Sequence, residues 1–229
     1  MIELAYESAH LAIAKKPSGI ATTAPDGGDS LTTRLEAQLG VKLHPTSRLD
    51  AEVSGLVTFA KTKDAIHALK QARERGAYFR EYLGLAVVAP TPREGVWDAS
   101  IAIDPRDRRL RIAVPEGGSG ERLQRARTRY EVLEEFLGGA ALALFPETGR
   151  THQLRVHAAN AGAPLLGDVR YGGPRRVTLD DGRVVRAARV MLHCRRLRLP
   201  NVEGGELDLV EPPPPDVFKV WRSLGGSPR

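Results

Sequence analysis

The chain has 229 residues, of which 41% are apolar and 27% charged, which is the composition of an ordinary globular protein. Its single cysteine, Cys194, excludes an internal disulfide, and no run approaches the roughly 18 apolar residues of a membrane span. The first residues lack the basic and apolar stretches of a secretory signal. We therefore expect a protein of the cytoplasm with no membrane partner.

The charge balance favours an anionic partner. Lys and Arg number 34 against 28 Asp and Glu, so the net charge is +6. Arginine dominates the basic set, and because it binds phosphate bidentately and stacks on bases, a nucleic acid is one interpretation. A GC-rich genome also raises arginine over lysine, and composition alone leaves both explanations open.

The first half of the chain alternates between strands and helices. Residues 10–23 read as a strand, a Pro-Ser-Gly turn and a second short strand. Helices are predicted over residues 30–40 and 62–76, each beginning at a hydroxyl side chain that can cap it and ending at a glycine. Between them, residues 55–61 form an apolar strand pattern.

The second half is richer in strands. Strand patterns occur at residues 77–88, 96–103, 108–114, 126–136, 141–147, 189–200 and 205–212. Helices are predicted at residues 150–162 and 214–224. Because strands and helices do not alternate strictly, we predict an α+β fold, with a large mixed, mainly antiparallel β-sheet flanked by a few helices in a single domain over residues 1–229.

The stretch HPTSRLDAEVSGLVTFAKT, residues 44–62, places a lone carboxylate just before an apolar strand. Asp50 lies two residues after Arg48 and four before Ser54. As a turn residue, Asp50 would bond to local amides. As a catalytic residue, it would be a nucleophile or an acid/base held on a loop over a rigid sheet. The stretch by itself leaves both interpretations open.

Two other segments concentrate reactive or polar side chains. In FREYLGLAVV, Arg80 and Tyr82 share one face of a predicted strand. In PETGRTHQLRVHAANAGAPLLGD, hydroxyl, amide, imidazole and guanidinium groups crowd between Thr148 and Arg155. His152 and Arg155 are three residues apart and share one side of the predicted helix. This density of polar groups is too high for a helix packed in a core.

Several common catalytic centres do not fit the sequence. His152 and His157 are five residues apart and fall off a shared helical face, and the cysteine stands alone, so we expect no metal site. The chain contains neither a phosphate-binding loop nor the G-x-S-x-G pattern of serine hydrolases. One carboxylate, one phenol and several arginines remain. That set suits nucleophilic or acid/base chemistry on an anionic polymer without a cofactor.

These segments resemble, in their order along the chain, the motifs of the RluA-type RNA pseudouridine synthases. SRLDAEVSGLVTFAKT resembles their H-R-L-D-x-x-T-S-G-L-L-L-F-A-K-T signature, and FREYLGLAVV resembles their K-x-Y-x-A-x-V strand. ETGRTHQLRVHAANAGAPLLGDVRYG is similar to their T-G-R-T-H-Q-I-R-V-H block, which continues as G-x-P-I-x-G-D-x-x-Y-G. AIAKKPSGI and MLHCRRLRL resemble their N-K-P-x-G turn and L-H-A-x-x-L strand. The resemblance implies the pseudouridine synthase catalytic fold and RNA pseudouridine synthase activity.

The sequence departs from the family pattern at three positions. Ser47 replaces the histidine before Arg-Leu-Asp, Val53 replaces a threonine, and Lys15 replaces the asparagine before Lys-Pro. The aspartate, phenol and arginine are retained, so the departures bear on substrate fit more than on chemistry. Because about ten residues precede the first motif, the small S4-type RNA-binding domain that many relatives carry is expected to be absent.

The resemblance also assigns roles to individual residues. It implies that Asp50 is the catalytic carboxylate, that Arg155 forms an ion pair with it, and that Tyr82 lies against the uracil and moves the C5 proton. A structural salt bridge is the alternative for the ion pair, and ordinary strand packing is the alternative for Tyr82. No cofactor or metal is required by this chemistry.

The implied partner is RNA, either ribosomal or transfer RNA, bound by a monomer. Arg48 would fill the gap left by a flipped uridine, while Arg150 and Lys61 are candidates for phosphate contacts. Solvated surface charge is the alternative for Lys61. Two other functions stay open, a non-catalytic RNA-binding module and a glycosidic hydrolase, which would need a second carboxylate such as Glu52.

Overall fold

The computed structural model describes residues 1–24 and 26–227. The chain divides into two compact units, Met1–Glu81 with His193–Pro212 and Tyr82–Leu192 with Pro213–Arg229. Strands β5 (Phe79–Ala86) and β13 (Leu192–Pro200) each belong partly to both units, so the backbone passes between them within regular structure. Among the described residues, no helix combines the length and apolar character needed to cross a bilayer.

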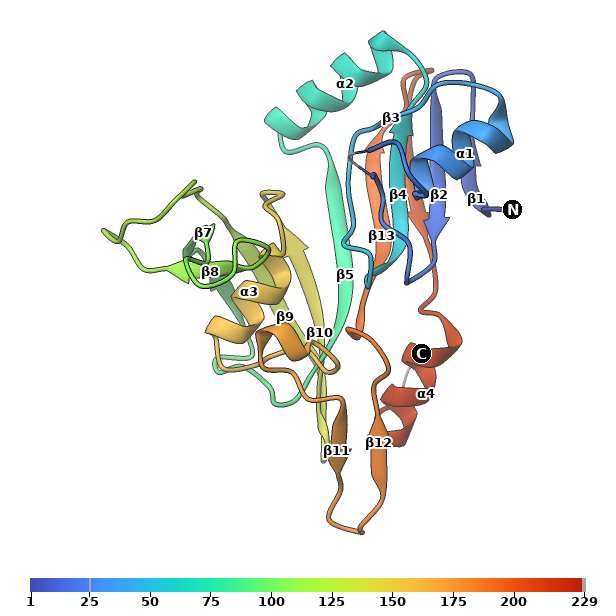
Figure 1. Ribbon diagram of the computed structural model, residues 1–229. Helices are drawn as coiled ribbons and strands as arrows, with labels where there is room; N and C mark the ends of the chain where they lie inside the picture. Colours follow the sequence, from blue (N-terminus) through green and yellow to red (C-terminus); the bar gives the residue numbers. More distant parts are fainter. Residues whose placement is uncertain (25, 228–229) are drawn as a thin grey trace. The chain divides into compact units, whose positions relative to one another are not determined.

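The first unit is a sheet with two helices (Figure 1). Its strands are hydrogen-bonded in the order β1-β2-β4-β13, with β3 pairing with β4 and β14 with β13. Their bounds are Leu4–Glu7 for β1, Leu11–Lys16 for β2, His44–Pro45 for β3, Ser54–Ala60 for β4 and Glu206–Val210 for β14. β13 runs parallel to β4, whereas the pairs β1–β2, β2–β4, β3–β4 and β13–β14 are antiparallel.

Strand β4 is the centre of this unit because it is buried along its whole length. Gly55, at its start, has a φ of +118°, and a Cβ there would lie 2.3 Å from the carbonyl oxygen of Cys194 in β13. Only glycine allows the two backbones to approach this closely. The glycine of the Ser-Gly pair therefore fixes how β4 meets β13 directly after the Asp50 loop.

The two helices of the first unit begin where the sequence predicts. Ser30 caps α1 (Leu31–Leu39) with a capping box, and Gly40 closes it in the left-handed conformation. The Thr62 side chain caps α2 (Lys63–Glu74) by accepting a hydrogen bond from the Ala65 amide. Each helix places apolar residues on its inner face, including Leu31 and Leu35 of α1 and Leu69 of α2.

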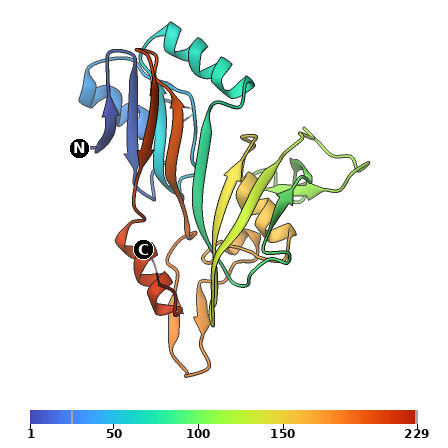
Figure 2. The same cartoon turned by 180° about the vertical axis from the view of Figure 1, so that it is seen from behind.

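The second unit contains an antiparallel sheet in the order β5-β10-β9-β6 (Figure 2). Helix α3 contacts β8, β9 and β10, and α4 packs with the β11–β12 hairpin in an apolar cluster that includes Leu85, Leu166 and Trp221. The bounds are Glu94–Trp97 for β6, Ser100–Ile103 for β7, Arg111–Val114 for β8, Thr128–Phe136 for β9, Gly139–Pro146 for β10, Gln153–Asn160 for α3, Val169–Tyr171 for the 3-10 helix η1, Arg176–Thr178 for β11, Val184–Arg186 for β12 and Pro215–Ser223 for α4.

The predicted fold class is confirmed, since the strands form mixed and mainly antiparallel pairs and four α-helices flank them in the described chain. Two predicted strands are wrong in detail. The pattern at residues 96–103 is split into β6 and β7, which belong to different sheets. The split covers Asp98 and Ala99, and the Ala99 carbonyl lies 2.9 Å from Nε2 of buried His157 instead of pairing with a neighbouring strand.

The second strand predicted within residues 10–23 does not form. Its place is taken by a segment without regular structure, in which the Thr22 side chain bonds to the Asp50 loop. Thr22 Oγ1 donates to the Leu49 carbonyl at 2.9 Å and accepts from the Leu49 amide at 3.0 Å. A hydroxyl thus replaces the two backbone groups that a strand would have supplied.

Candidate functional site

The Asp50 loop, residues 46–53, connects β3 to β4 in the first unit. Leu49 and Val53 are buried, with 7% and 2% of their surface exposed, whereas Asp50 is half-buried and Arg48 is exposed. The two apolar side chains anchor the loop on either side of the carboxylate. The Val53 amide also donates to the Asp50 carbonyl at 3.0 Å, which closes a tight turn.

The turn after β2 holds this loop through its backbone. The Gly19 amide donates to the Ala51 carbonyl at 2.7 Å, and the Ser18 hydroxyl donates to the Glu52 carbonyl at 2.9 Å. With the Thr22 contacts to Leu49, the peptide groups on both sides of Asp50 are hydrogen-bonded to one neighbouring segment. The loop is consequently held in place by hydrogen bonds to this segment and not only by the strands β3 and β4 that it connects.

The buried side chain of Lys16 also links the turn after β2 to the Asp50 loop. It is 2% exposed, and its Nζ donates to the carbonyls of Pro17 at 3.0 Å, Ile20 at 2.6 Å and Ala51 at 3.1 Å. Burying an ammonium is unfavourable unless its protons are bonded, and three carbonyls provide for this. The sequence predicts a turn at KKPSG but does not indicate that Lys16 holds the Asp50 loop, which only the structure shows.

The start of β4 is fixed by a buried histidine. Ser54 Oγ lies 3.0 Å from Nδ1 of His193, and Nε2 of His193 lies 3.1 Å from the Glu211 carbonyl. A carbonyl can only accept, so Nε2 carries a proton, and in the neutral imidazole the Ser54 hydroxyl donates to Nδ1. His193 is the histidine of the MLHCRRLRL segment, and this geometry makes it a structural residue of the first unit.

Tyr82 lies on β5 in the second unit and is 6% exposed. Its Cα pairs across the ladder with that of Leu144 in β10. The preceding residue, Glu81, belongs to the first unit and forms an ion pair with Arg195 of β13. Tyr82 therefore stands at the point of β5 where the chain enters the second unit, with most of its surface covered by protein.

Arg155 is held by a carboxylate that the sequence reading did not single out. The guanidinium of Arg155 on α3 binds Asp168 bidentately, with Nε–Oδ2 and Nη2–Oδ1 distances both 2.7 Å. The two side chains are 3% and 1% exposed. The Tyr171 ring centroid lies 4.9 Å from the guanidinium carbon, which adds a cation–π contact. The sequence did indicate where the partners of Arg155 lie, because the motif segment GDVRYG contains both Asp168 and Tyr171.

The loop before α3 is organised by one amide side chain. Gln153 Oε1 accepts from the Thr148 hydroxyl at 2.7 Å and from the Arg150 amide at 3.0 Å. Its Nε2 donates to the Arg127 carbonyl at 2.9 Å and to Thr128 Oγ1 at 3.0 Å. All four hydrogen-bonding positions of the amide are therefore used, so Gln153 braces the loop before α3.

His152 precedes α3 in a backbone conformation that is unusual for a residue with a side chain. Its φ is +58°, and its Nδ1 lies 2.6 Å from the Tyr171 hydroxyl. That hydroxyl also accepts from the Arg111 amide at 3.0 Å. The polar cluster of Arg155, Asp168, Tyr171 and His152 thus lies within one unit and links the start of α3 to η1 and β8.

The remaining predicted contact residues have different surroundings. Lys61 Nζ binds the Glu7 carboxylate at 2.7 Å and the Ser8 carbonyl at 2.8 Å, and its side chain is 12% exposed. Lys61 is therefore engaged in the first unit, and a phosphate contact there stays a prediction. Arg150 is half-buried in the second unit and donates from Nε to the Arg125 carbonyl at 2.9 Å.

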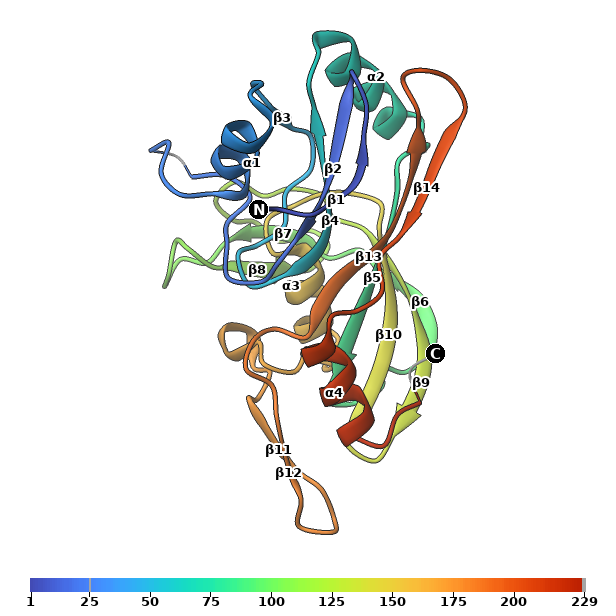
Figure 3. The same ribbon diagram turned by 90° about the vertical axis from the view of Figure 1, so that its right-hand side faces the viewer.

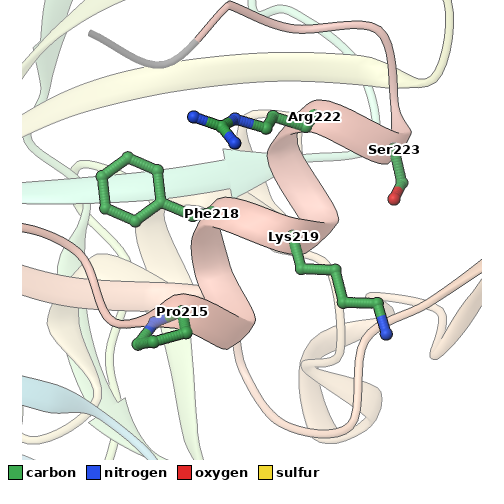
Figure 4. Close-up of a pocket in the computed structure, with 5 residues that line it drawn as sticks. All are labelled: Pro215, Phe218, Lys219, Arg222 and Ser223. Atoms are coloured by element: carbon green, nitrogen blue, oxygen red, sulfur yellow. The ribbon is translucent and has the colours of Figure 1, made fainter.

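The structure places Arg48, Asp50 and Lys61 in the first unit, and it places Tyr82, Arg150 and Arg155 in the second. The predicted ion pair between Asp50 and Arg155 joins residues of different units and stays a prediction. A pocket on the outer side of α4 is lined by Pro215, Phe218, Lys219, Arg222 and Ser223 (Figure 4). All of these belong to one helix, and none of them is a predicted site residue.

Comparison with known proteins adds a family assignment to this geometry. A family model described as RNA pseudouridylate synthase matches residues 10–160. The chain is 36% identical to the ribosomal large subunit pseudouridine synthase D of Nitrosomonas europaea over 225 residues, which cover 94% of this chain and 62% of that protein. It is 32% identical to an uncharacterized RNA pseudouridine synthase of Zymomonas mobilis, with 96% of this chain and 95% of that protein covered.

A solved structure gives the same result for the fold. The structure of human RNA pseudouridylate synthase domain containing 4 superposes with a TM-score of 0.75 at 25% identity, covering 99% of this chain and 94% of that one. The chain spans between 42% and 62% of the length of the first three curated relatives. The matched region includes the Asp50 loop, β5 and α3.

Proposed function

The chain belongs to the RNA pseudouridylate synthase family, and on this basis we propose that it converts uridine to pseudouridine within RNA. One observation carries the proposal. The family match covers the Asp50 loop, and in the structure this loop holds a half-buried carboxylate between two buried anchors, Leu49 and Val53. The anchors hold the carboxylate in one place on the loop, as a catalytic group requires.

The reaction is an isomerisation that needs no redox step. The bond between N1 of uracil and C1′ of ribose breaks, the uracil rotates, and a new bond forms between C5 and C1′. C5 loses a proton and N1 gains one, so the atoms balance without another reactant. The enzyme must hold the detached base in place, and such pre-orientation supplies much of the barrier reduction in reactions of this type.

Asp50 is the proposed catalytic carboxylate. It attacks C1′, attacks C6, or removes a proton from the sugar, and each of these three roles requires the ionised form. We propose Arg155 as the counter-charge that favours this ionised form. Asp168 supports the proposal by fixing the Arg155 guanidinium through two 2.7 Å contacts, so that the cation is oriented before substrate binds.

Tyr82 is proposed to lie against the uracil and to move the C5 proton late in the reaction. Its position on a buried strand supports a fixed orientation of the ring. A uridine inside a stem must first leave the helix, at an energetic cost of a few kcal/mol. We propose that the exposed Arg48 occupies the gap left by the flipped base, and that Arg150 and Lys61 contact phosphates.

Ribosomal and transfer RNA are the two substrate classes that we propose. The name of the Nitrosomonas relative makes large-subunit ribosomal RNA the first to test. We propose that the protein acts as a monomer in the cytoplasm. Mapping of pseudouridine across total RNA from a deletion strain and its parent identifies the target uridines, because each site lost in the deletion strain is a site of this enzyme.

The direct test of the chemistry is Asp50→Asn, with Glu52→Gln as the matched control. Both changes remove one carboxylate from the same loop and keep the shape of the side chain. We expect Asp50→Asn to bind RNA normally and to lose turnover by far more than tenfold, whereas Glu52→Gln keeps its turnover. Turnover of Asp50→Asn within about tenfold of wild type would remove Asp50 from the mechanism.

The same assay separates the other functional classes. Release of free uracil by the wild-type protein would indicate a glycosidic hydrolase. RNA binding without any change in the RNA would indicate a non-catalytic binding module. The proposed function requires formation of pseudouridine in the RNA. Because pseudouridine has the same mass as uridine, the nucleosides are separated by chromatography before mass spectrometry.

A further inference from the structure

The hairpin formed by β11 and β12 carries a feature that the proposed catalytic residues do not explain. Figure 3 shows this hairpin beside α4, with its turn projecting from the second unit. Val177 and Val185 face each other across its two strands. Val185 is buried in the apolar cluster that contains Trp221 of α4, and Val177 packs against that cluster. One face of the hairpin is therefore fixed to the body of the unit.

The opposite face presents two arginines directly across from one another. Arg176 of β11 pairs in register with Arg186 of β12, and both are exposed. The Ala187 amide donates to the Arg175 carbonyl at 2.9 Å, so the adjacent pair, Arg176 and Arg186, falls at a position without backbone hydrogen bonds. Cross-strand side chains are closest at such positions. Like charges placed there destabilise a hairpin.

Neither guanidinium forms an ion pair with a carboxylate among residues 1–24 and 26–227. The nearby Asp181 is bound to Arg183, with an Nε–Oδ2 distance of 2.6 Å. Several arginines elsewhere have carboxylate partners, in the pairs Arg34–Asp29, Arg108–Glu121, Arg109–Asp107 and Arg196–Asp208. The Arg176–Arg186 pair therefore keeps two positive charges together on a short, fixed hairpin.

The chain connects this pair to the polar cluster around Arg155. Asp168 binds Arg155, and its carbonyl accepts from the amides of Tyr171 and Gly173, each at 2.9 Å. A Cβ on Gly173 would lie 1.7 Å from the Leu165 carbonyl, so the chain is tightly packed where it leaves η1. β11 begins three residues later. The hairpin thus follows directly after a tightly packed segment that includes a residue orienting Arg155, Asp168.

We propose that Arg176 and Arg186 form a phosphate-binding site for the RNA backbone outside the uridine that is modified. Each guanidinium can bind phosphate oxygens bidentately, and a phosphate between the two relieves their mutual repulsion. The exposed face holds only one apolar side chain, Val184, which is too little for the apolar centre of a protein interface. This inference rests on the proposed function, because it assumes that the substrate is RNA.

The test compares two double variants that lose the same charge. Arg176→Gln/Arg186→Gln removes the hairpin pair, and Arg34→Gln/Arg196→Gln removes two exposed arginines that have carboxylate partners. The binding of a labelled RNA stem–loop is measured by fluorescence anisotropy from about 50 to 200 mM KCl. We expect the hairpin variant to bind roughly tenfold more weakly and to lose between about 1 and 2 from the slope of log Kd against log salt.

Two further measurements show whether a weaker binding of RNA is accompanied by a change in stability or in the rate of the reaction. The melting temperature of the hairpin variant should equal or exceed that of wild type, because a repulsion has been removed. Its single-turnover rate at saturating RNA should be unchanged. The control variant should keep its Kd within about twofold. A hairpin variant with wild-type Kd and salt slope, or a control variant that is weakened equally, would overturn the proposed site.

The outcome for the wild-type protein distinguishes this inference from the proposed function. If wild type forms pseudouridine and the hairpin variant binds RNA normally, only the hairpin site is wrong. If RNA binding depends on the hairpin but no pseudouridine forms on ribosomal or transfer RNA, only the proposed activity is wrong. If wild type binds no RNA, both are overturned.

Discussion

Replacing Asp168 by asparagine tests whether Arg155 depends on a buried counter-charge. Asparagine keeps the shape of the side chain but removes its charge. Its amide nitrogen would replace one of the two carboxylate oxygens that lie 2.7 Å from the guanidinium, so that an N–H donor would face an N–H donor of Arg155. Since the two side chains are only 3% and 1% exposed, water cannot replace the lost carboxylate oxygen. The guanidinium would be left with a single neutral acceptor on this side.

The expected loss of stability follows from the burial of the pair. Removing one partner of a buried ion pair costs about 3–5 kcal/mol, and for a chain of this size each kcal/mol lowers the melting temperature by about 2–4 °C. We therefore expect Asp168→Asn to melt roughly 6–20 °C below wild type. Turnover should fall as well, because the guanidinium that we assign to Asp50 would no longer be oriented.

Asp208→Asn is the matched control, measured by the same thermal and urea unfolding experiments. Asp208 binds Arg196 with the same bidentate geometry, at 2.7 and 2.5 Å, but both side chains are 39% exposed. An exposed pair contributes about 0–1 kcal/mol, so this variant should melt within a few degrees of wild type. Equal melting temperatures for the two variants would refute the reasoning from burial.

Three other changes test separate parts of the structure. Gly55→Ala should lower the free energy of unfolding by about 3 kcal/mol or more in urea titrations, since its Cβ would meet the Cys194 backbone, whereas Gly76→Ala, which meets no atom within 4 Å, should lose about 1 kcal/mol. Tyr82→Phe should keep its RNA affinity and lose product in single-turnover assays; a core tyrosine would instead lose about 1 kcal/mol of stability and keep its rate. Burial lowers the pKa of His157 below 6.5, so stability should be full above about pH 6.5 and fall as the pH drops toward the folded pKa. His157→Gln should flatten this dependence of the melting temperature on pH, and an unchanged profile would contradict it.

Local signals made the helices of the first unit predictable. The capping residues Ser30, Gly40 and Thr62 bond to residues only a few positions away in the sequence, and each capping contact is present in the structure. The Asp168–Arg155 pair could not be read in this way, because the two residues are separated by a loop and meet only through tertiary packing. Sequence motifs indicated both segments but not the bond between them.

The β11–β12 hairpin escaped sequence prediction for a different reason. Its strands have three residues each, Arg176–Thr178 and Val184–Arg186, which is too short for an alternating pattern to be recognised. The burial of Val185 against α4 stabilises it, and that contact joins segments about 30 residues apart in the chain. Likewise, the role of Lys16 depends on carbonyls from two segments that only the folded chain brings together.

The three-carbonyl contact of Lys16 has a consequence for local opening of the fold. Separation of either segment breaks at least one of these hydrogen bonds to a buried ammonium, which is unfavourable, so opening of the turn at residues 17–20 is coupled to opening of the Asp50 loop. In native-state hydrogen exchange, such segments behave as one cooperative unit. The Gly19 and Val53 amides, which are bonded to Ala51 and Asp50, should then exchange at matching rates, and Lys16→Met should accelerate both by the same factor. Opening of the loop that carries the Asp50 carboxylate would thus depend on the hydrogen bonds of a buried lysine, Lys16.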